Sequence, residues 1–336
     1  MAAQQTTTSP APPASPEHRP RRLSERVPAP LLVVGSVIGI QVGQAFGKQM
    51  FGAVGPFGVV TLRLVFAAVI LLALWRPRLP SGWRERGLVM ALGTAIAGMN
   101  VVYLALRHLD VGVAVTLQFL GPLVLALAGS RRLLDLVWGA LAWLGVALFA
   151  DPFGGGHGLP LIGLVYGLVS AAAMAAYVVL NKRAGTRSLD GSYLAYAVAF
   201  AALLSLPTGI GEGGTALLEP GVLLAGLGVA VLSAAIPYSL DLAALRRLPA
   251  RTVAVLESLE PAVAGLAAIL VLSELLNGWQ WLAIACVTVA SLGAVLTPAK
   301  RPAGRRGGRR ARRTFPQSVL ASPHLKGKAF PSGTRE

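Results

Sequence analysis

Four ionisable side chains lie inside long apolar runs of the sequence, where a charge is unexpected: Arg63, Asp241, Glu257 and Glu260. At the centre of a bilayer such a side chain costs about 2.5 to 3.5 kcal/mol on insertion scales, so each is a functional candidate. Glu257 and Glu260 are three residues apart, and on a helix they share one face and meet the same cavity or partner helix. A carboxyl group that binds and releases a proton there has the chemistry that proton coupling needs. The alternative interpretation is a structural ion pair with Arg63.

Other polar and helix-breaking residues occur in the same runs. Asp241 follows the break at Pro237-Tyr238-Ser239, and it is either part of a polar site or a side chain that extends to the membrane interface. The prolines at Pro122, Pro237 and Pro261 each free a backbone carbonyl inside a helix, although prolines also serve packing alone. A further set of side chains either lines a cavity or forms hydrogen bonds between helices. It comprises Gln41, Gln44, Asn100, Tyr103, Gln118 and Tyr238.

The sequence lacks the motifs that ATP binding, metal binding and disulfide formation require. Gly47-Lys48 resembles the end of a Walker A motif, but Val42 stands where the first glycine is required, so ATP-driven transport by this chain alone is not expected. The four histidines are scattered, and none has the spacing of a metal motif. Cys286 is the only cysteine, which excludes disulfides within the chain. We therefore expect no cofactor and no metal ion. An integral-membrane enzyme is disfavoured, because no histidine or acid-rich ligand cluster lies at membrane depth.

The elements that hold these residues are long apolar segments. The chain has 336 residues, of which 54% are hydrophobic and 13% charged, a balance typical of a protein solvated by lipid. A helix needs about 20 mostly apolar residues to cross a bilayer, and Gly, Pro and charged residues divide the chain into segments of that length. We predict an all-α membrane protein with ten transmembrane helices, at residues 31–50, 57–75, 87–106, 111–129, 133–150, 160–180, 191–210, 221–243, 250–272 and 279–298.

The distribution of Lys and Arg predicts the orientation of the chain. With both tails in the cytoplasm, the inner loops carry most cations, including Arg76 and Lys182, whereas the outer loops hold only Lys48 and Arg107. An even number of crossings follows, and the expected location is the cell membrane. The first apolar run follows a Pro/Ala/Thr-rich tail without an apolar core, so no cleaved signal peptide is expected.

The sequence also repeats itself. The segment from Ala105 to Pro122 aligns without a gap on the segment from Ala244 to Pro261, and both contain Ala-Leu-Arg-x-Leu and a final proline. In this alignment Gln118 is equivalent to Glu257, and both are expected to face a central cavity. Each half has an odd number of crossings, so the copies must have opposite orientations, as in many alternating-access transporters; chance similarity of two apolar helices is the alternative. The predicted parts are a disordered tail at 1–30, repeats at 31–150 and 160–298, and a basic disordered tail at 299–336.

The formal net charge of +16 suggests nucleic acid, but the location of the charge favours a membrane surface. A Gly/Pro-rich stretch of the C-terminal tail, expected to be disordered, concentrates eight cations. Beside a membrane helix such a cluster binds anionic lipid headgroups. A nucleic-acid-binding tail is the alternative, and salt-dependent binding of the isolated peptide to DNA but not to anionic vesicles would favour it. The cations are Lys300, Arg301, Arg305, Arg306, Arg309, Arg310, Arg312 and Arg313.

Several polar motifs inside the predicted helices are specific. They are Ile40-Gln-Val-Gly43, Val60-Thr-Leu-Arg-Leu64, Gly98-Met-Asn100, Gly129-Ser-Arg-Arg132 followed by Asp135, Ser233-Ala-Ala-Ile-Pro-Tyr-Ser-Leu-Asp241, Ala244-Leu-Arg-Arg-Leu-Pro249 and Ser258-Leu-Glu-Pro261. With them, residues 31–298 resemble the EamA-type drug/metabolite transporters, and within these the threonine/homoserine exporter group. The resemblance implies the ten-helix inverted-repeat fold, cytoplasmic tails and amino-acid export. The chain differs from that group at Gln118, where glutamate is usual, and at Glu257, where methionine is usual.

Residues and resemblance together predict an ATP-independent exporter of a small polar metabolite such as an amino acid, working by alternating access. The substrate would bind near the membrane midplane, between the two halves. Glu257 and Glu260 would bind a proton or an ammonium group, and Arg63 would bind a carboxylate or act as a counter-ion. The alternative within this class is import or exchange of another metabolite or a drug.

If both tails are cytoplasmic, cysteines introduced at Ser9 and Ser318 will resist an impermeant thiol reagent in intact cells and will react after the membrane is permeabilised. A cysteine introduced at Thr215, in a predicted outer loop, is the positive control. Labelling of either tail position in intact cells would overturn the predicted topology.

Overall fold

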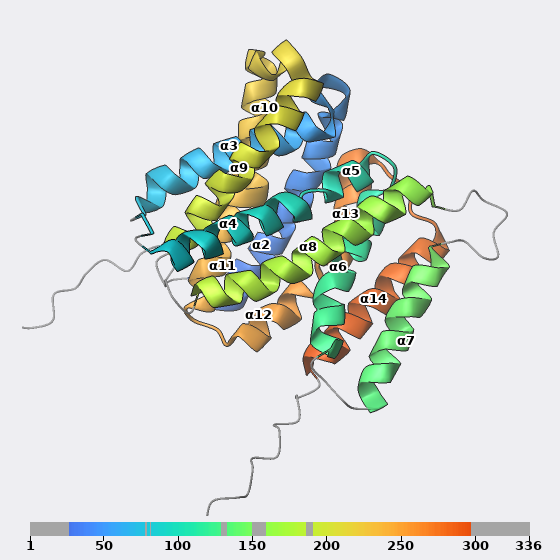
Figure 1. The fold of residues 1–336 in the computed structure, drawn as a ribbon. Coiled ribbons are helices and arrows are strands. Elements are labelled where there is room, and N and C mark those ends of the chain that lie inside the picture. Colours follow the sequence, from blue (N-terminus) through green and yellow to red (C-terminus); the bar gives the residue numbers. More distant parts are fainter. Residues whose placement is uncertain are drawn as a thin grey trace, which may run out of the picture. The chain divides into compact units, whose positions relative to one another are not determined.

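The computed structural model describes residues 27–77, 79–80, 82–128, 133–149, 159–185 and 191–296. These residues form helices and the turns between them, with no strand among them (Figure 1). The all-α prediction is therefore confirmed for this part of the chain. Apart from residues 27–30, the two predicted tails lie outside the described residues, and so does the cluster of eight cations.

The described part of the first half supplies six helices, and α4 and α5 belong to one membrane crossing. Their bounds are α2 Ala29–Gln49, α3 Phe51–Trp75, α4 Trp83–Met99, α5 Val102–Leu106, α6 Val111–Ala128 and α7 Leu133–Leu148. The described part of the second half supplies α8 Leu161–Gly185, α9 Ser192–Gly213, α10 Pro220–Ala230, α11 Ile236–Leu245, α12 Ala250–Glu257, α13 Glu260–Leu272 and α14 Gly278–Leu296. The 3-10 turn η1, Gly214–Leu218, precedes α10, and the π-helical turn η2, Val231–Ala235, joins α10 to α11.

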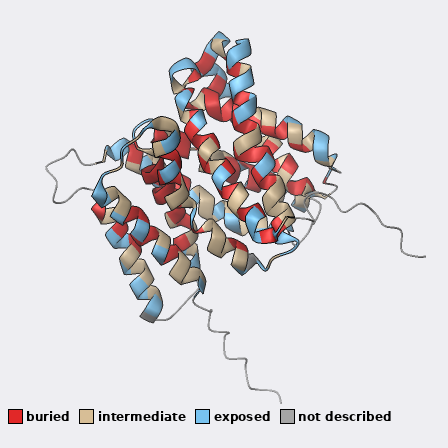
Figure 2. Cartoon of the chain, turned by 180° about the vertical axis from the view of Figure 1, so that it is seen from behind, coloured by how far each residue is buried: buried red, intermediate tan, exposed pale blue. Residues whose placement is uncertain are grey.

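Nine helical stretches of the described residues are long and apolar enough to cross a membrane, and α7 contains a shorter apolar one, Leu134–Leu148. These ten stretches fall where the sequence predicted ten crossings. The surface agrees with a lipid environment, because large apolar side chains such as Trp143 and Leu270 are 74% and 82% exposed. Figure 2 shows buried residues where helices meet and exposed ones along their outer sides. The described part of the chain is therefore built as a multi-pass membrane bundle.

Three predicted helices are not continuous, which the apolar pattern alone did not reveal. A turn at Asn100 separates α4 from α5, a turn at Ser258 separates α12 from α13, and η2 interrupts the crossing from α10 to α11. In the second half, Pro261 lies in the first turn of α13, where the missing N–H has no helical partner to lose. Pro237 follows η2 within a continuous helical run, so its missing N–H leaves a carbonyl of the preceding turn without a helical partner. Irregular backbone at membrane depth is tolerated where protein buries it. The breaks therefore identify the polar interior of the bundle.

Close contacts between helices depend on glycine. A Cβ added to Gly43 of α2 would lie 2.6 Å from the Cβ of Ser233 in η2. At Gly121 of α6 it would lie only 1.9 Å from the carbonyl oxygen of Ala171 in α8. Small residues at such contacts let two backbones approach directly, and that close packing is what holds helices together in lipid.

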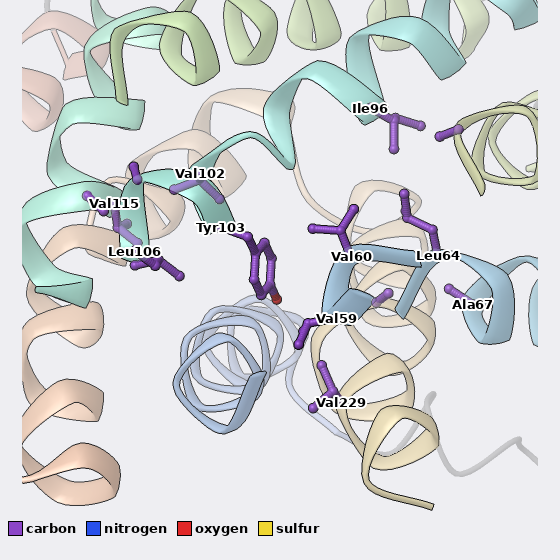
Figure 3. Close-up of a cluster of buried hydrophobic side chains, with 14 of the residues drawn as sticks. Val59, Val60, Leu64, Ala67, Ile96, Val102, Tyr103, Leu106, Val115 and Val229 are labelled. Carbon is purple, nitrogen blue, oxygen red and sulfur yellow. The ribbon is translucent and has the colours of Figure 1, made fainter. Parts of the chain in front are cut away.

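The largest buried apolar cluster lies beside these contacts. Tyr103 of α5 is completely buried in it, together with Val59, Val60 and Leu106 (Figure 3). Figure 3 shows the Tyr103 ring reaching from α5 toward α2 and α3, inside the bundle, where the side chain is fully buried. This position brings a polar atom to the part of the bundle where the helices are broken.

Substituting Gly121→Ala should lower the thermal stability, because the added methyl group cannot coexist with the Ala171 carbonyl and α6 must move away from α8. Overpacking of this kind costs about 1 to 3 kcal/mol. The unfolding temperature of the purified protein in detergent measures the effect. Gly52→Ala is the matched control, since nothing lies within 4 Å of the added atom. Equal unfolding temperatures for the two variants would contradict this packing.

Candidate functional site

Arg63 of α3 is buried, with 4% of its surface exposed, and it is held by two broken helices. Its Nε donates to the Ser233 hydroxyl at 2.7 Å and its Nη2 to the Ser233 carbonyl at 2.8 Å, while its Nη1 donates to Oδ1 of Asn100 at 2.5 Å. The guanidinium carbon also lies 5.8 Å from the centre of the Tyr103 ring, within cation–π range. Neutral groups therefore fix the orientation of this cation.

Local backbone structure explains why Ser233 and Asn100 are available. The π-helical turn η2 shifts the hydrogen-bond pattern around Ser233, so its carbonyl faces a side chain, and its hydroxyl also donates to the Val229 carbonyl at 2.7 Å. Asn100 ends α4, and its Nδ2 donates to the Ile96 carbonyl at 2.7 Å, which orients Oδ1 toward the arginine. The predicted alternative of an ion pair between Arg63 and Glu257 or Glu260 is not found among the described residues.

Three acids gather at a second position in the same interior. Asp241 of α11, Glu257 at the end of α12 and Glu260 at the start of α13 interact electrostatically with one another, and all three are half-buried. Nε2 of Gln41 in α2 donates to Oε2 of Glu260 at 3.2 Å. Pro261 is buried directly after Glu260, in the first turn of α13. Glu257 and Glu260 were predicted to share one face of a continuous helix, but a turn at Ser258 divides that helix between them; the two acids still interact, and the fold brings Asp241 to them from another helix.

Two tyrosines lie near these charged groups. Tyr238 of α11 is buried and interacts electrostatically with both Arg63 and Asp241. Tyr177 of α8 interacts in the same way with Tyr238 and with all three acids, and its hydroxyl accepts from Nδ2 of Asn181 at 3.3 Å. Sequence reasoning missed Tyr177, because a lone tyrosine in an alanine-rich apolar run gives no signal of its own.

Five buried oxygens of this interior form no hydrogen bond of normal geometry among the described residues. Three of these groups have a polar neighbour: Tyr103 is near Ser233, Tyr238 near Arg63 and Asp241 near Ser36. Buried polar groups in proteins almost always have a partner, in the protein or in ordered water. Five orphaned acceptors beside an arginine and three acids are therefore the mark of a site that a polar ligand or water completes. The atoms are Oε1 of Gln41, Oε1 of Gln44, the hydroxyls of Tyr103 and Tyr238, and Oδ1 of Asp241.

Two predicted site residues take part differently. Gln118 of α6 donates to the Met99 carbonyl at 2.8 Å and to the Ser170 hydroxyl at 2.6 Å, so its amide nitrogen bonds α4 and α8 and not the acids. Pro122 lies one turn further along α6 and is half-buried. The described residues contain no group of His, Cys, Asp and Glu arranged to hold a metal ion.

A membrane bundle whose broken helices bring charged groups together in its interior is the architecture of a secondary transporter. Residues 161–296 match the EamA-like transporter family. The threonine/homoserine exporter RhtA of Salmonella typhimurium (strain LT2) is 38% identical over 84% of the chain and 96% of that exporter, and RhtA of Escherichia coli (strain K12) is 38% identical over 83% and 95%. The chain belongs to the EamA-like transporter family, and it is a membrane transporter and not an enzyme.

A solved crystal structure also resembles this fold. Its TM-score is 0.56 with 19% sequence identity, and the match covers 79% of the chain and 96% of the other protein. At this identity the likeness concerns the fold alone.

Arg63→Lys should reduce transport by at least about ten-fold although the charge is kept, because a compact ammonium cannot bond Ser233 and Asn100 together as the planar guanidinium does. The flux of a labelled amino acid, corrected for the amount of protein in the membrane, measures the effect. Arg84→Lys is the control, since Arg84 is exposed in the first turn of α4, away from this site. Normal flux through the Arg63→Lys variant would show that Arg63 is not part of the transport site.

Proposed function

We propose that the protein exports a small neutral amino acid, with threonine and homoserine as the first candidates, without ATP and by alternating access. The printed function of the two relatives supports the substrate class. The observation that carries the proposal is the separation of charge in the interior: neutral groups orient Arg63, and the three acids lie near one another without an ion pair to it among the described residues. An amino acid presents a carboxylate and an ammonium group, and a site of low dielectric must meet both.

In this arrangement Arg63 binds the substrate carboxylate, and Asp241, Glu257 and Glu260 surround the ammonium group. Four further groups are left to bind the polar side chain of the substrate as acceptors or donors. They are the hydroxyls of Tyr103 and Tyr238 and the amides of Gln41 and Gln44. Such a substrate satisfies the orphaned oxygens, which an apolar solute would leave unpaired at a cost of about 1 to 3 kcal/mol each. The site therefore favours a small hydroxylated amino acid over an apolar drug.

The packing supports two inverted repeats at 31–150 and 160–298. Helix α3 packs against α9, α6 against α13 and α7 against α14, so each of these helices contacts the one in the equivalent place of the other half. Helix α2 packs against α11 just as α8 packs against α4 (Figure 1). A pseudo-two-fold axis generates such a pattern, and repeats with five crossings each are related by an axis in the membrane plane.

Ion pairs across the two halves suggest which side is closed. Nζ of Lys48 lies 2.6 Å from Oε1 of Glu274, and Arg107 lies 3.3 Å from Glu212. With both tails in the cytoplasm, as the Lys/Arg distribution predicts, all four residues are on the outer side. Export then requires both pairs to open while the basic tail at 299–336 stays on the anionic inner leaflet.

Proton exchange at the acids is the proposed energy source. In proteoliposomes loaded with threonine, more protons on the receiving side should accelerate efflux, because a carboxyl that gains a proton there releases the ammonium group and loses that proton on the other side. Glu260→Gln should remove this response, since an amide exchanges no proton. Glu219→Gln, at an exposed position before α10, should respond like the wild type.

Each result separates two parts of the proposal. Threonine efflux that ignores the pH gradient would refute proton coupling and leave amino-acid export intact. Absence of threonine and homoserine efflux, while another solute moves through the same proteoliposomes, would refute the substrate assignment.

A further inference from the structure

The backbone next to the Arg63 site contains a carbonyl that lacks its helical partner. In a continuous helix the N–H of Tyr103 would bond the Met99 carbonyl, but here it bonds the carbonyl of Asn100 at 3.0 Å. The next N–H, that of Leu104, bonds the Val101 carbonyl at 2.9 Å. The turn between α4 and α5 thus leaves the Met99 carbonyl without a backbone donor. At this depth in the membrane, side chains must supply the donor in place of water.

Two side chains from other helices fill this gap. Nε2 of Gln118 in α6 donates to the Met99 carbonyl at 2.8 Å, and the Ser170 hydroxyl of α8 donates to the same oxygen at 2.7 Å. Nε2 of Gln118 also lies 2.6 Å from the Ser170 hydroxyl, which closes the triangle. Gln118 is 7% exposed and Ser170 is fully buried. Bonds in such surroundings are strong, and breaking one leaves a buried group unpaired.

The residue after Met99 is Asn100, which accepts the hydrogen bond from Nη1 of Arg63. The conformation of the turn therefore decides where the Asn100 amide points, and the amide in turn decides how the guanidinium lies. We propose that Gln118 is a positioning residue for substrate binding, acting through the Met99 carbonyl and Asn100 on Arg63 without touching the substrate. The proposal rests on the proposed role of Arg63 as the group that binds the substrate carboxylate.

The first test compares two substrates. Gln118→Met keeps the approximate volume of the side chain and removes its donor, and it should raise KM for threonine about ten-fold with a smaller change in kcat. The KM for threonine amide, which has no carboxylate, should stay within about two-fold of wild type, because Arg63 has no anion to bind there. Thr116→Val is the control for loss of a buried polar group on the same helix, since the Thr116 hydroxyl bonds only the Gly112 carbonyl of its own helix.

The second test uses pH. In Gln118→Glu a protonated carboxyl keeps one donor for the Met99 carbonyl, whereas the ionised form has none and places an anion against that oxygen. The ratio of the KM of this variant to that of the wild type should therefore rise with pH. A side chain that merely fills space would give a ratio independent of pH.

The outcomes separate this proposal from the proposed function. Equal loss for threonine and threonine amide in Gln118→Met, an unchanged KM for both, or a pH-independent ratio in Gln118→Glu would overturn the positioning role. An unchanged KM for threonine in Arg63→Lys would overturn the proposed role of Arg63, and the positioning role with it. A raised KM in Arg63→Lys together with a normal KM in Gln118→Met would overturn the positioning role alone.

Discussion

A buried guanidinium must be satisfied inside a bundle that is solvated by lipid, and much of the interior is arranged to do so. An isolated charge taken out of water costs several kcal/mol, so Arg63 can lie where it does only if protein groups replace its hydration. Ser233 supplies two acceptors, Asn100 supplies a third, and the Tyr103 ring covers one face. None of these partners carries a negative charge. The field of the cation therefore stays available to an anionic ligand group, which a structural ion pair would have neutralised.

Binding Arg63 in this way requires irregular backbone, and irregular backbone at membrane depth leaves carbonyl groups that need new hydrogen-bond donors. The π-helical turn η2 exposes the Ser233 carbonyl, and the turn after α4 presents Asn100. Each break frees carbonyls that other groups must satisfy, as Gln118 and Ser170 do for Met99. The Arg63 site is consequently held by residues from six helical segments, α3, α4, α5, η2, α6 and α8.

Glycine makes these long-range contacts geometrically possible. Because Gly43 lies directly on Ser233, α2 approaches η2 closely enough for Gln41, on the same helix, to reach Glu260 in α13. The Gly121 contact with α8 likewise holds Gln118 within reach of Ser170. Packing density and polar chemistry are thus linked, since a larger residue at either glycine would separate the helices that share the polar groups.

The sequence by itself determined the class of the protein and most of its helices. Apolar length and Lys/Arg punctuation are local properties, so ten segments could be placed within a few residues, and α7 is short where the prediction was also shortest. The exceptional cost of charge in lipid pointed to Arg63, Asp241, Glu257 and Glu260 without any contact being known. Spacing also predicted that Glu257 and Glu260 share one helix face, whereas the structure ends one helix at Glu257 and begins the next at Glu260.

Tertiary structure alone decided how these residues are partnered. Sequence offered the acids as partners of Arg63, and the fold instead gave it Ser233 and Asn100, because the π-helical turn and the broken α4 arise from packing between distant segments. Gln118 was aligned with Glu257 and expected to face the same cavity, yet its amide nitrogen bonds a carbonyl that exists only because another helix is broken. Tyr177 carried no signal at all until α8 brought it to the acids. The apolar length of a helix depends only on its own residues, whereas a hydrogen bond between helices depends on the positions of two chain segments at once.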